Sequence, residues 1–210
     1  MESAARTVKN ILLRERHLNF SDEWFDACID WIKENHPPSQ VNVTFLRDEV
    51  CNQWMDVNLM DLGCKCLPDD LCSQKCVTLP GHYALQVNII EDIGESSYSQ
   101  WNKLKKLTNE NTNVSGGETN ESKPTWEPKP RRCLYLTMSD GSQEVFGLEL
   151  VTVPALNVDV KTGSKVLISG PIECRRGVLH LKPGNVRILG GEVEALVEAN
   201  AFEQVLQKRL

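Results

Sequence analysis

The sequence lacks long apolar runs and the short motifs of common catalytic sites. No stretch approaches the roughly 18 apolar residues that span a membrane, and the N-terminal segment has no apolar signal core. No G-x-S-x-G, P-loop or H-E-x-x-H pattern occurs, and the four histidines lie in different segments. We therefore expect neither a secreted protein nor an enzyme, and we expect no cofactor.

Positive charge is also scarce. The chain has 23 basic and 29 acidic residues, a net charge of −6 and a pI of about 5.3. Domains that hold bare nucleic acid as their main task usually have a basic face. This balance disfavours such a task for the chain as a whole.

Cysteine is not scarce, but its spacing fits zinc poorly. Eight cysteines in a chain without a secretory signal are expected to be reduced thiols. Four of them, Cys64, Cys66, Cys72 and Cys76, lie in "CKCLPDDLCSQKC", which raises the alternative of a zinc site. Structural zinc sites usually use pairs two to four residues apart, so the first pair is too close. We predict no metal, and a purified protein without stoichiometric zinc would settle the question.

Residues 1–63 predict a three-helix bundle. Apolar side chains recur at three- and four-residue spacing in three short stretches, around Val8, Trp31 and Val50. Ser21 is placed to cap the second helix, and Pro37 with Pro38 should end it. Three amphipathic helices bury their stripes most simply against each other.

Residues 77–210 predict a small β-barrel. The apolar period changes to two in "YALQVNI" and "CLYLTM", and three further strands follow, the last interrupted by Pro183 and Gly184. Asp140-Gly141 predicts a two-residue hairpin, and "EVEALVEANAFEQVLQKRL" predicts one C-terminal helix. Five strands with one long connection fit an OB-type barrel, with a generic five-stranded meander as the alternative. The fold class is therefore α+β, mainly β.

A long insertion separates the first two predicted strands, at about residues 94–131. It contains "LTNENTNVSGGETNESKPTWEPKP", whose polar composition predicts disorder in isolation. Loops longer than about 12–15 residues are usually functional or disordered. From Glu95 to Arg132 it carries seven basic and five acidic residues, so it is slightly cationic on an acidic body.

Apolar anchors in this insertion suggest a partner. Side chains at about three-residue spacing form a stripe, and a second aromatic anchor lies among prolines further on. The expected partner-binding residues are Tyr98, Trp101, Lys103, Leu104, Leu107, Trp126 and Pro128. The candidate nucleic-acid contacts are Lys105, Lys106, Arg131 and Arg132. The alternative is a solvated linker without a function.

The runs "WFDACIDWI", "LQVNIIEDIGESSYSQWNKL", "WEPKPRRCLYLTMSDG" and "GVLHLKPGNVRILGGEVEAL" resemble the RecQ-mediated genome instability protein 1 family, in its N-terminal region. The resemblance implies a helical bundle followed by an OB-fold whose insertion lies between the first two strands. It implies a nuclear, non-catalytic scaffold that binds topoisomerase III-alpha and a Bloom-type RecQ helicase. Such a scaffold favours decatenation and the dissolution of double Holliday junctions.

The resemblance also implies that one copy acts in a hetero-complex and meets DNA mainly through it. Lys165 lies in "TGSKVLI", which matches a family pattern, and is expected either to contact the partner or to be a solvated lysine on a strand edge. Relatives in animals continue into a second OB-fold, whose role is not expected of these residues. Two alternatives remain: a stand-alone OB-fold that binds single-stranded DNA, and a tudor-type relative that binds topoisomerase III-beta.

Overall fold

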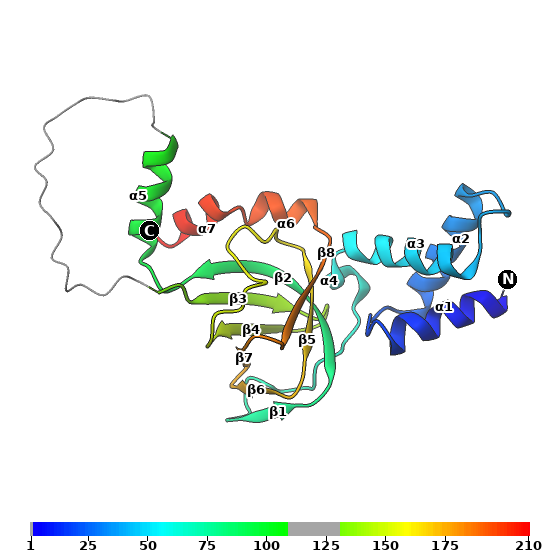
Figure 1. The fold of residues 1–210 in the computed structure, drawn as a ribbon, viewed down its shortest axis with the longest axis horizontal. Helices are drawn as coiled ribbons and strands as arrows, with labels where there is room; N and C mark the ends of the chain where they lie inside the picture. Colours follow the sequence, from blue (N-terminus) through cyan, green and yellow to red (C-terminus); the bar gives the residue numbers. More distant parts are fainter. Residues whose placement is uncertain (1, 109–130) are drawn as a thin grey trace, which may run out of the picture.

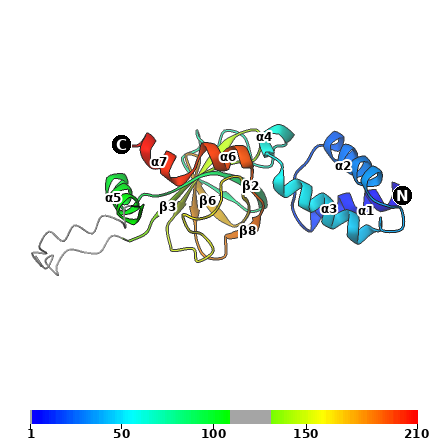
Figure 2. The same cartoon turned by 90° about the horizontal axis from the view of Figure 1, so that it is seen from above.

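The computed structural model describes residues 2–108 and 131–210. Its parts follow one another in space: a helical bundle, a curled β-sheet, and a helix of the insertion at the far end (Figure 1). A second view keeps this order, with the bundle and the insertion helix at opposite ends (Figure 2). Within the described residues, no helix has the length and apolar character needed to cross a membrane.

Three helices form the N-terminal bundle: α1 (Glu2–Arg14), α2 (Asp22–Asn35) and α3 (Val43–Asp56). The prediction of three helices is confirmed, and so is the cap, because Ser21 Oγ accepts a hydrogen bond from Trp24 N at 3.2 Å. α2 ends just ahead of the paired prolines that were expected to stop it.

Within the residues that the structure describes, eight strands form one sheet. They are β1 (Val77–Leu79), β2 (His82–Asp92), β3 (Leu134–Ser139), β4 (Glu144–Glu149), β5 (Lys165–Ser169), β6 (Ile172–Arg175), β7 (Val178–Leu181) and β8 (Val186–Gly190). Their order across the sheet is β1-β6-β7-β4-β3-β2-β5-β8. β4 and β7 pair in parallel and the other neighbours are antiparallel. β2 pairs with β5 along its first half and with β3 along its second, which lets the sheet curl into a barrel.

The predicted OB-fold is confirmed, although two of its five strands are each divided. β5 and β6 form one run that is interrupted at Gly170 and Pro171, and β7 and β8 form another that is interrupted around Pro183. Proline has no N–H for a ladder, so it tends to interrupt a strand where it occurs. β1 is an additional short strand that pairs with β6.

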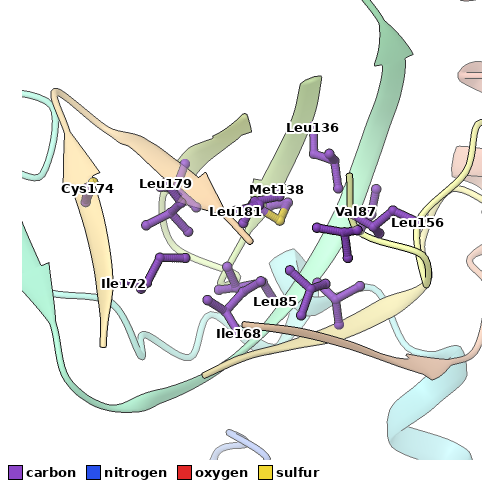
Figure 3. Packing of buried hydrophobic residues seen from close by; sticks show 14 of the residues in the cluster. Leu85, Val87, Leu136, Met138, Leu156, Ile168, Ile172, Cys174, Leu179 and Leu181 are labelled. Atoms are coloured by element: carbon purple, nitrogen blue, oxygen red, sulfur yellow. The ribbon is translucent and has the colours of Figure 1, made fainter. Parts of the chain in front are cut away.

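The barrel interior is filled by aliphatic and sulfur-containing side chains. Residues from β2 to β7 and from the β4–β5 connection point toward one another, among them Leu85, Val87, Leu136, Met138, Leu156, Ile168, Leu179 and Leu181 (Figure 3). Each of these is less than 1% exposed. Burial of one such side chain stabilises the fold by about 1.5–3 kcal/mol.

The helical bundle is packed directly on the barrel. Trp54 is fully buried, and Ala84 of β2 and Leu167 of β5 belong to the same buried cluster as the side chains of α1–α3. A short helix, α4 (Leu59–Leu62), continues the junction, and Leu59 N donates to Gln86 Oε1 at 3.0 Å. The two parts therefore share a core.

The turn between β3 and β4 differs from the predicted two-residue hairpin. It contains four residues, because Asp140 Oδ1 accepts from the backbone N–H groups of Ser142 and Gln143, both at 3.0 Å. The other carboxylate oxygen accepts from Cys66 N and Leu67 N. The turn is thus shaped by a contact with a distant segment.

The expected single C-terminal helix is two short helices, α6 (Glu194–Ala199) and α7 (Phe202–Lys208). The break falls at Asn200, whose Nδ2 donates to Asn88 O of β2 at 3.0 Å. That long-range hydrogen bond draws the chain out of helical geometry, so the prediction of one continuous helix is wrong.

Candidate partner-binding site

The insertion leaves β2 and returns to β3 with its two ends held side by side. Ile93 N donates to Cys133 O at 2.8 Å. Asp92 Oδ1 accepts from Gly94 N at 2.8 Å and from Cys133 N at 2.9 Å. A Cβ on Gly94 would lie 2.0 Å from Arg131 O, so this close approach requires glycine. The insertion therefore starts from a fixed base.

A helix, α5 (Ser97–Thr108), rises from this base. Gln100 Nε2 donates to Asp92 O at 2.7 Å and to Glu95 O at 2.8 Å, which ties the first turn of the helix to the end of β2. The helix also packs against α7. The direction of α5 is therefore set by the barrel and by the C-terminal helix.

Lys103, an expected partner contact, is paired within the insertion. Its Nζ lies 2.7 Å from Glu95 Oε2, and Ser99 Oγ donates to the same carboxylate. Hydrogen bonds from Lys103 and Ser99 lower the pKa of Glu95. A partner that uses Lys103 must compete with this pair.

The apolar stripe of α5 is divided between solvent and the protein. Tyr98 is 67% exposed, whereas Trp101 and Leu104 are half-buried. Lys105 Nζ lies 5.0 Å from the centre of the Trp101 ring, in a cation–π arrangement. Tyr98 is thus the aromatic side chain of α5 that faces solvent, and Ile93 of the base, 48% exposed, also faces solvent.

A cavity of about 230 Å³ lies between the base, α5 and α7. Glu91 and Arg209 line it, joined by an ion pair of 2.5 Å, together with Gln100 and Phe202. Burial raises the pKa of Glu91, and Arg209 opposes that effect. α5 contributes Ser97 and Gln100 to the lining of this cavity.

Arg132, a candidate nucleic-acid contact, is engaged inside the protein. Its guanidinium donates to Glu149 Oε1 at 2.5 Å and to the carbonyl oxygens of Val153 and Leu156. Burial alone would raise the pKa of Glu149, but hydrogen bonds from Arg132 and the backbone lower it. Arg132 therefore holds the β4–β5 connection against the barrel, and only Arg131 of this pair is exposed.

Lys165 is not the surface residue that we expected. It is 0% exposed, and its Nζ donates to Met55 O at 2.9 Å and to Gly163 O at 2.8 Å. Burial lowers its pKa to about 8, against the attraction of Asp56. Because Met55 lies in α3, Lys165 joins the bundle to the barrel instead of contacting a partner.

Two family models match the chain on either side of that junction. "RMI1, N-terminal helical domain" matches residues 12–55 and "RMI1, N-terminal OB-fold domain" matches residues 67–204. The chain belongs to the RMI1 family.

Relatives from distant species agree with this membership. RecQ-mediated genome instability protein 1 of Mus musculus is 38% identical over 206 residues, which cover 98% of this chain and 33% of the relative. The Arabidopsis thaliana protein of the same name is 29% identical over 189 residues, 90% of this chain and 26% of the relative. Tudor domain-containing protein 3 of Danio rerio is 26% identical over 151 residues, 72% of this chain and 17% of the relative. The chain spans about a third of the length of the Mus musculus protein. Membership of the RMI1 family supports a role in genome stability for this OB-fold region.

Several expected contacts of this RMI1-family insertion fall outside the described residues. Trp126 and Pro128 lie wholly outside the described residues, and the side chains of Lys106 and Leu107 are also outside them. They stay predictions. The structure gives a position to the first half of the expected site, from the base to Leu104.

A pair of aromatic rings lies on the outer face of the RMI1-family barrel. Tyr135 of β3 and Phe146 of β4 stack there, with ring centres 5.6 Å apart, and both are half-buried. The sequence alone did not place Phe146 on either face of its strand. Its neighbours Val145 and Gly147 face the interior, so the alternation along β4 was the signal that could have placed it outside.

Of the cysteines in "CKCLPDDLCSQKC", Cys64 and Cys66 are half-buried, whereas Cys72 and Cys76 are exposed. Cys66 Sγ donates to Ala84 O at 3.7 Å, and Cys76 Sγ donates to Glu173 Oε1 at 3.3 Å. Burial raises the pKa of Cys66 to about 12. Among the residues that the structure describes, no three potential ligands gather around a metal position.

Proposed function

We propose that the chain is a non-catalytic subunit that binds topoisomerase III-alpha through its insertion and acts with a Bloom-type RecQ helicase in the nucleus. It modulates strand passage, which favours decatenation and the dissolution of double Holliday junctions. One copy of the chain acts in the complex, and it contacts DNA mainly through that complex. The membership of the RMI1 family supports the role in genome stability, and the partners are our proposal.

The exposure of Tyr98 on a helix with a fixed base carries the proposal. Aromatic side chains of this kind are common anchors of protein interfaces, and this one is 67% exposed. Because Gln100 and Asp92 already hold the direction of α5, binding costs less conformational entropy than the docking of a free loop would. A partner surface with a pocket for a tyrosine ring fits this arrangement.

The Ser–His contact of the barrel favours a structural role over hydrolysis. His82 Nδ1 lies 3.0 Å from Ser169 Oγ. A catalytic histidine is normally oriented by a third polar group, whereas the His82 ring is stacked on the ring of His17 at 4.3 Å. This arrangement supports a binding protein.

The test is the binding of topoisomerase III-alpha to the whole chain and to Tyr98→Ala. We expect binding about tenfold weaker for the variant, with a matching loss of stimulated decatenation. Met60→Ala is the control, because it removes an apolar side chain of 58% exposure from α4, outside the insertion. Equal affinity of Tyr98→Ala and the native chain would overturn the role of Tyr98.

A second variant tests the insertion as a whole. Replacement of residues 96–125 by a short glycine–serine linker leaves the hydrogen bonds between the ends of the insertion in place, so the barrel should still fold. We expect this variant to lose topoisomerase binding and stimulation. Unchanged decatenation by the complex that contains this variant would refute the proposal. Tighter binding of the native chain to topoisomerase III-beta than to topoisomerase III-alpha would support the tudor-type alternative.

The Tyr135–Phe146 pair favours a second candidate, the direct binding of single-stranded DNA. Stacked, half-exposed aromatics can accept bases at about 1–3 kcal/mol each. A direct binder that contacts several phosphates loses affinity steeply as salt rises. Weak binding of oligo(dT) at moderate salt, unchanged in Phe146→Ala, would favour the scaffold over this candidate.

A further inference from the structure

The surface where α2 ends and α3 begins carries three aromatic rings, Trp31, His36 and Phe45, that the bundle only partly covers. Trp31 is 45% exposed. His36 lies edge-on to Trp31, with ring centres 6.2 Å apart, and edge-on to Phe45, at 5.0 Å. The three rings follow one another across the surface from the end of α2 to the start of α3.

Beside these rings lies an open hollow of about 620 Å³. Phe45 forms its apolar part, and Asn42, Asp48 and Glu49 provide polar atoms around it. The surface is therefore hollowed beside Phe45 and offers both an apolar ring and polar atoms to an occupant.

The part of the chain that carries these rings is strongly acidic. Seven carboxylates and two basic residues lie between Ser21 and Val50. Both cations are paired on the surface, Lys33 with Asp30 at 2.6 Å and Arg47 with Asp48 at 2.6 Å.

Two carboxylates beside the rings keep their charge unmatched. Within the described part of the chain, no basic side chain forms an ion pair with Glu34 or Glu49. Glu34 is one helical turn from Trp31, so the two side chains lie on the same face of α2. Glu49 is one turn from Phe45 on α3, in the same relation.

We propose that this Trp31–Phe45 surface, with the hollow beside Phe45, binds an arginine- or lysine-rich segment of a partner protein. A guanidinium or ammonium group lies over the face of Trp31, where cation–π attraction favours it. Glu34 and Glu49 match the remaining positive charges of the segment.

Other occupants fit this surface less well. The phosphates of nucleic acid or of a membrane would be repelled by the carboxylates, and an apolar helix would bury Glu34 and Glu49 without partners. α2 and α3 lie at the opposite end of the molecule from α5 (Figure 2). The chain could therefore hold this segment and a topoisomerase at once, on separate surfaces.

The test uses the whole chain and a short fluorescein-labelled arginine–serine peptide, followed by fluorescence anisotropy. We expect about tenfold weaker binding for Trp31→Ala. The double variant Glu34→Gln/Glu49→Gln should lose about as much. The control is Glu194→Gln/Glu198→Gln, which removes the same charge from exposed positions on α6, and it should change the affinity less than about twofold.

A second measurement separates this site from general charge attraction. In a two-dimensional NMR titration, the indole N–H signal that is missing from Trp31→Ala should shift with the peptide. It should not shift with a glutamate–serine peptide or with oligo(dT). Equal losses in the two double variants, an unchanged affinity of Trp31→Ala, or a stationary Trp31 signal would each overturn the proposal.

Discussion

Asp92 and Cys133 lie on either side of the insertion and are joined by a 2.9 Å hydrogen bond from Cys133 N to Asp92 Oδ1. The same oxygen accepts from Gly94 N, so one carboxylate organises both the exit and the return of the chain. Asp92 therefore supports the base on which α5 stands, together with the backbone hydrogen bond from Ile93 N to Cys133 O.

Asp92→Ala should loosen the base of the insertion. It leaves two backbone N–H groups without their acceptor, and we expect a loss of about 1–3 kcal/mol in the free energy of unfolding. Urea denaturation measures this loss, and hydrogen exchange should be faster at Gly94 and Cys133. Asp92→Asn keeps an acceptor oxygen and is the control. Equal effects of the two variants would contradict the acceptor role.

Loss of Arg132 should be costly because its partner stays buried. The Glu149 side chain is 1% exposed, and Arg132→Met would leave its charge without the guanidinium. We expect a loss of about 3 kcal/mol in the free energy of unfolding, measured by urea denaturation. In the Arg132→Met background, Glu149→Gln should restore about 1 kcal/mol, because it removes the uncompensated charge. A double variant that is less stable than Arg132→Met would refute this explanation.

The stability of the chain should rise with pH in the range where Lys165 titrates. Its pKa is about 8 in the folded protein, whereas the ordinary value for a lysine is 10.5, so between these values the unfolded state binds more protons. The cost of the buried charge, about 3 kcal/mol, is fully present below pH 8 and is relieved as the pH approaches 10.5.

Lys165→Met isolates this contribution. Thiols such as Cys66, whose pKa is raised in the folded state, act in the opposite direction above pH 9. We therefore compare the native chain with Lys165→Met by urea denaturation from pH 7 to 10. The native chain should gain stability relative to the variant as the pH rises, and a constant difference would contradict the lowered pKa.

Much of the fold could be predicted from the sequence because its signals are local. The Ser21 cap acts on a backbone N–H three residues away. The alternation of Leu85 and Val87, and of Leu136 and Met138, places these side chains on one face of a strand whatever the partner strand is. Such short-range patterns are enough to indicate a helical bundle followed by a barrel.

The predictions for Lys165 and for the C-terminal helix were wrong because contacts between residues far apart in the sequence decide both. Lys165 and its acceptor Met55 are 110 residues apart, and Asn200 and its acceptor Asn88 are 112 apart. The local sequence of Lys165 is that of a strand with a charged residue, which normally faces solvent. Nothing near Lys165 or Asn200 in the sequence indicates that a backbone carbonyl of another element will meet the side chain.

Arg209→Ala should change the pH dependence of stability through Glu91. Glu91 is 8% exposed and already has a raised pKa from burial, with Arg209 at 2.5 Å as the opposing cation. Without Arg209 that pKa should rise further. A carboxyl group whose pKa is higher in the folded state binds more protons there, so its stabilising contribution is lost as the pH rises above 4.5.

The variant should therefore lose stability relative to the native chain between about pH 4.5 and 7. Urea denaturation at several pH values measures the difference, and Arg209→Lys should restore part of it by keeping the positive charge near Glu91. Because α5 packs against α7 beside this pair, Arg209→Ala should also speed the exchange of amide protons in α5 at pH 7. A difference in stability that stays constant with pH would mean that Arg209 acts through packing, with no effect on the charge of Glu91.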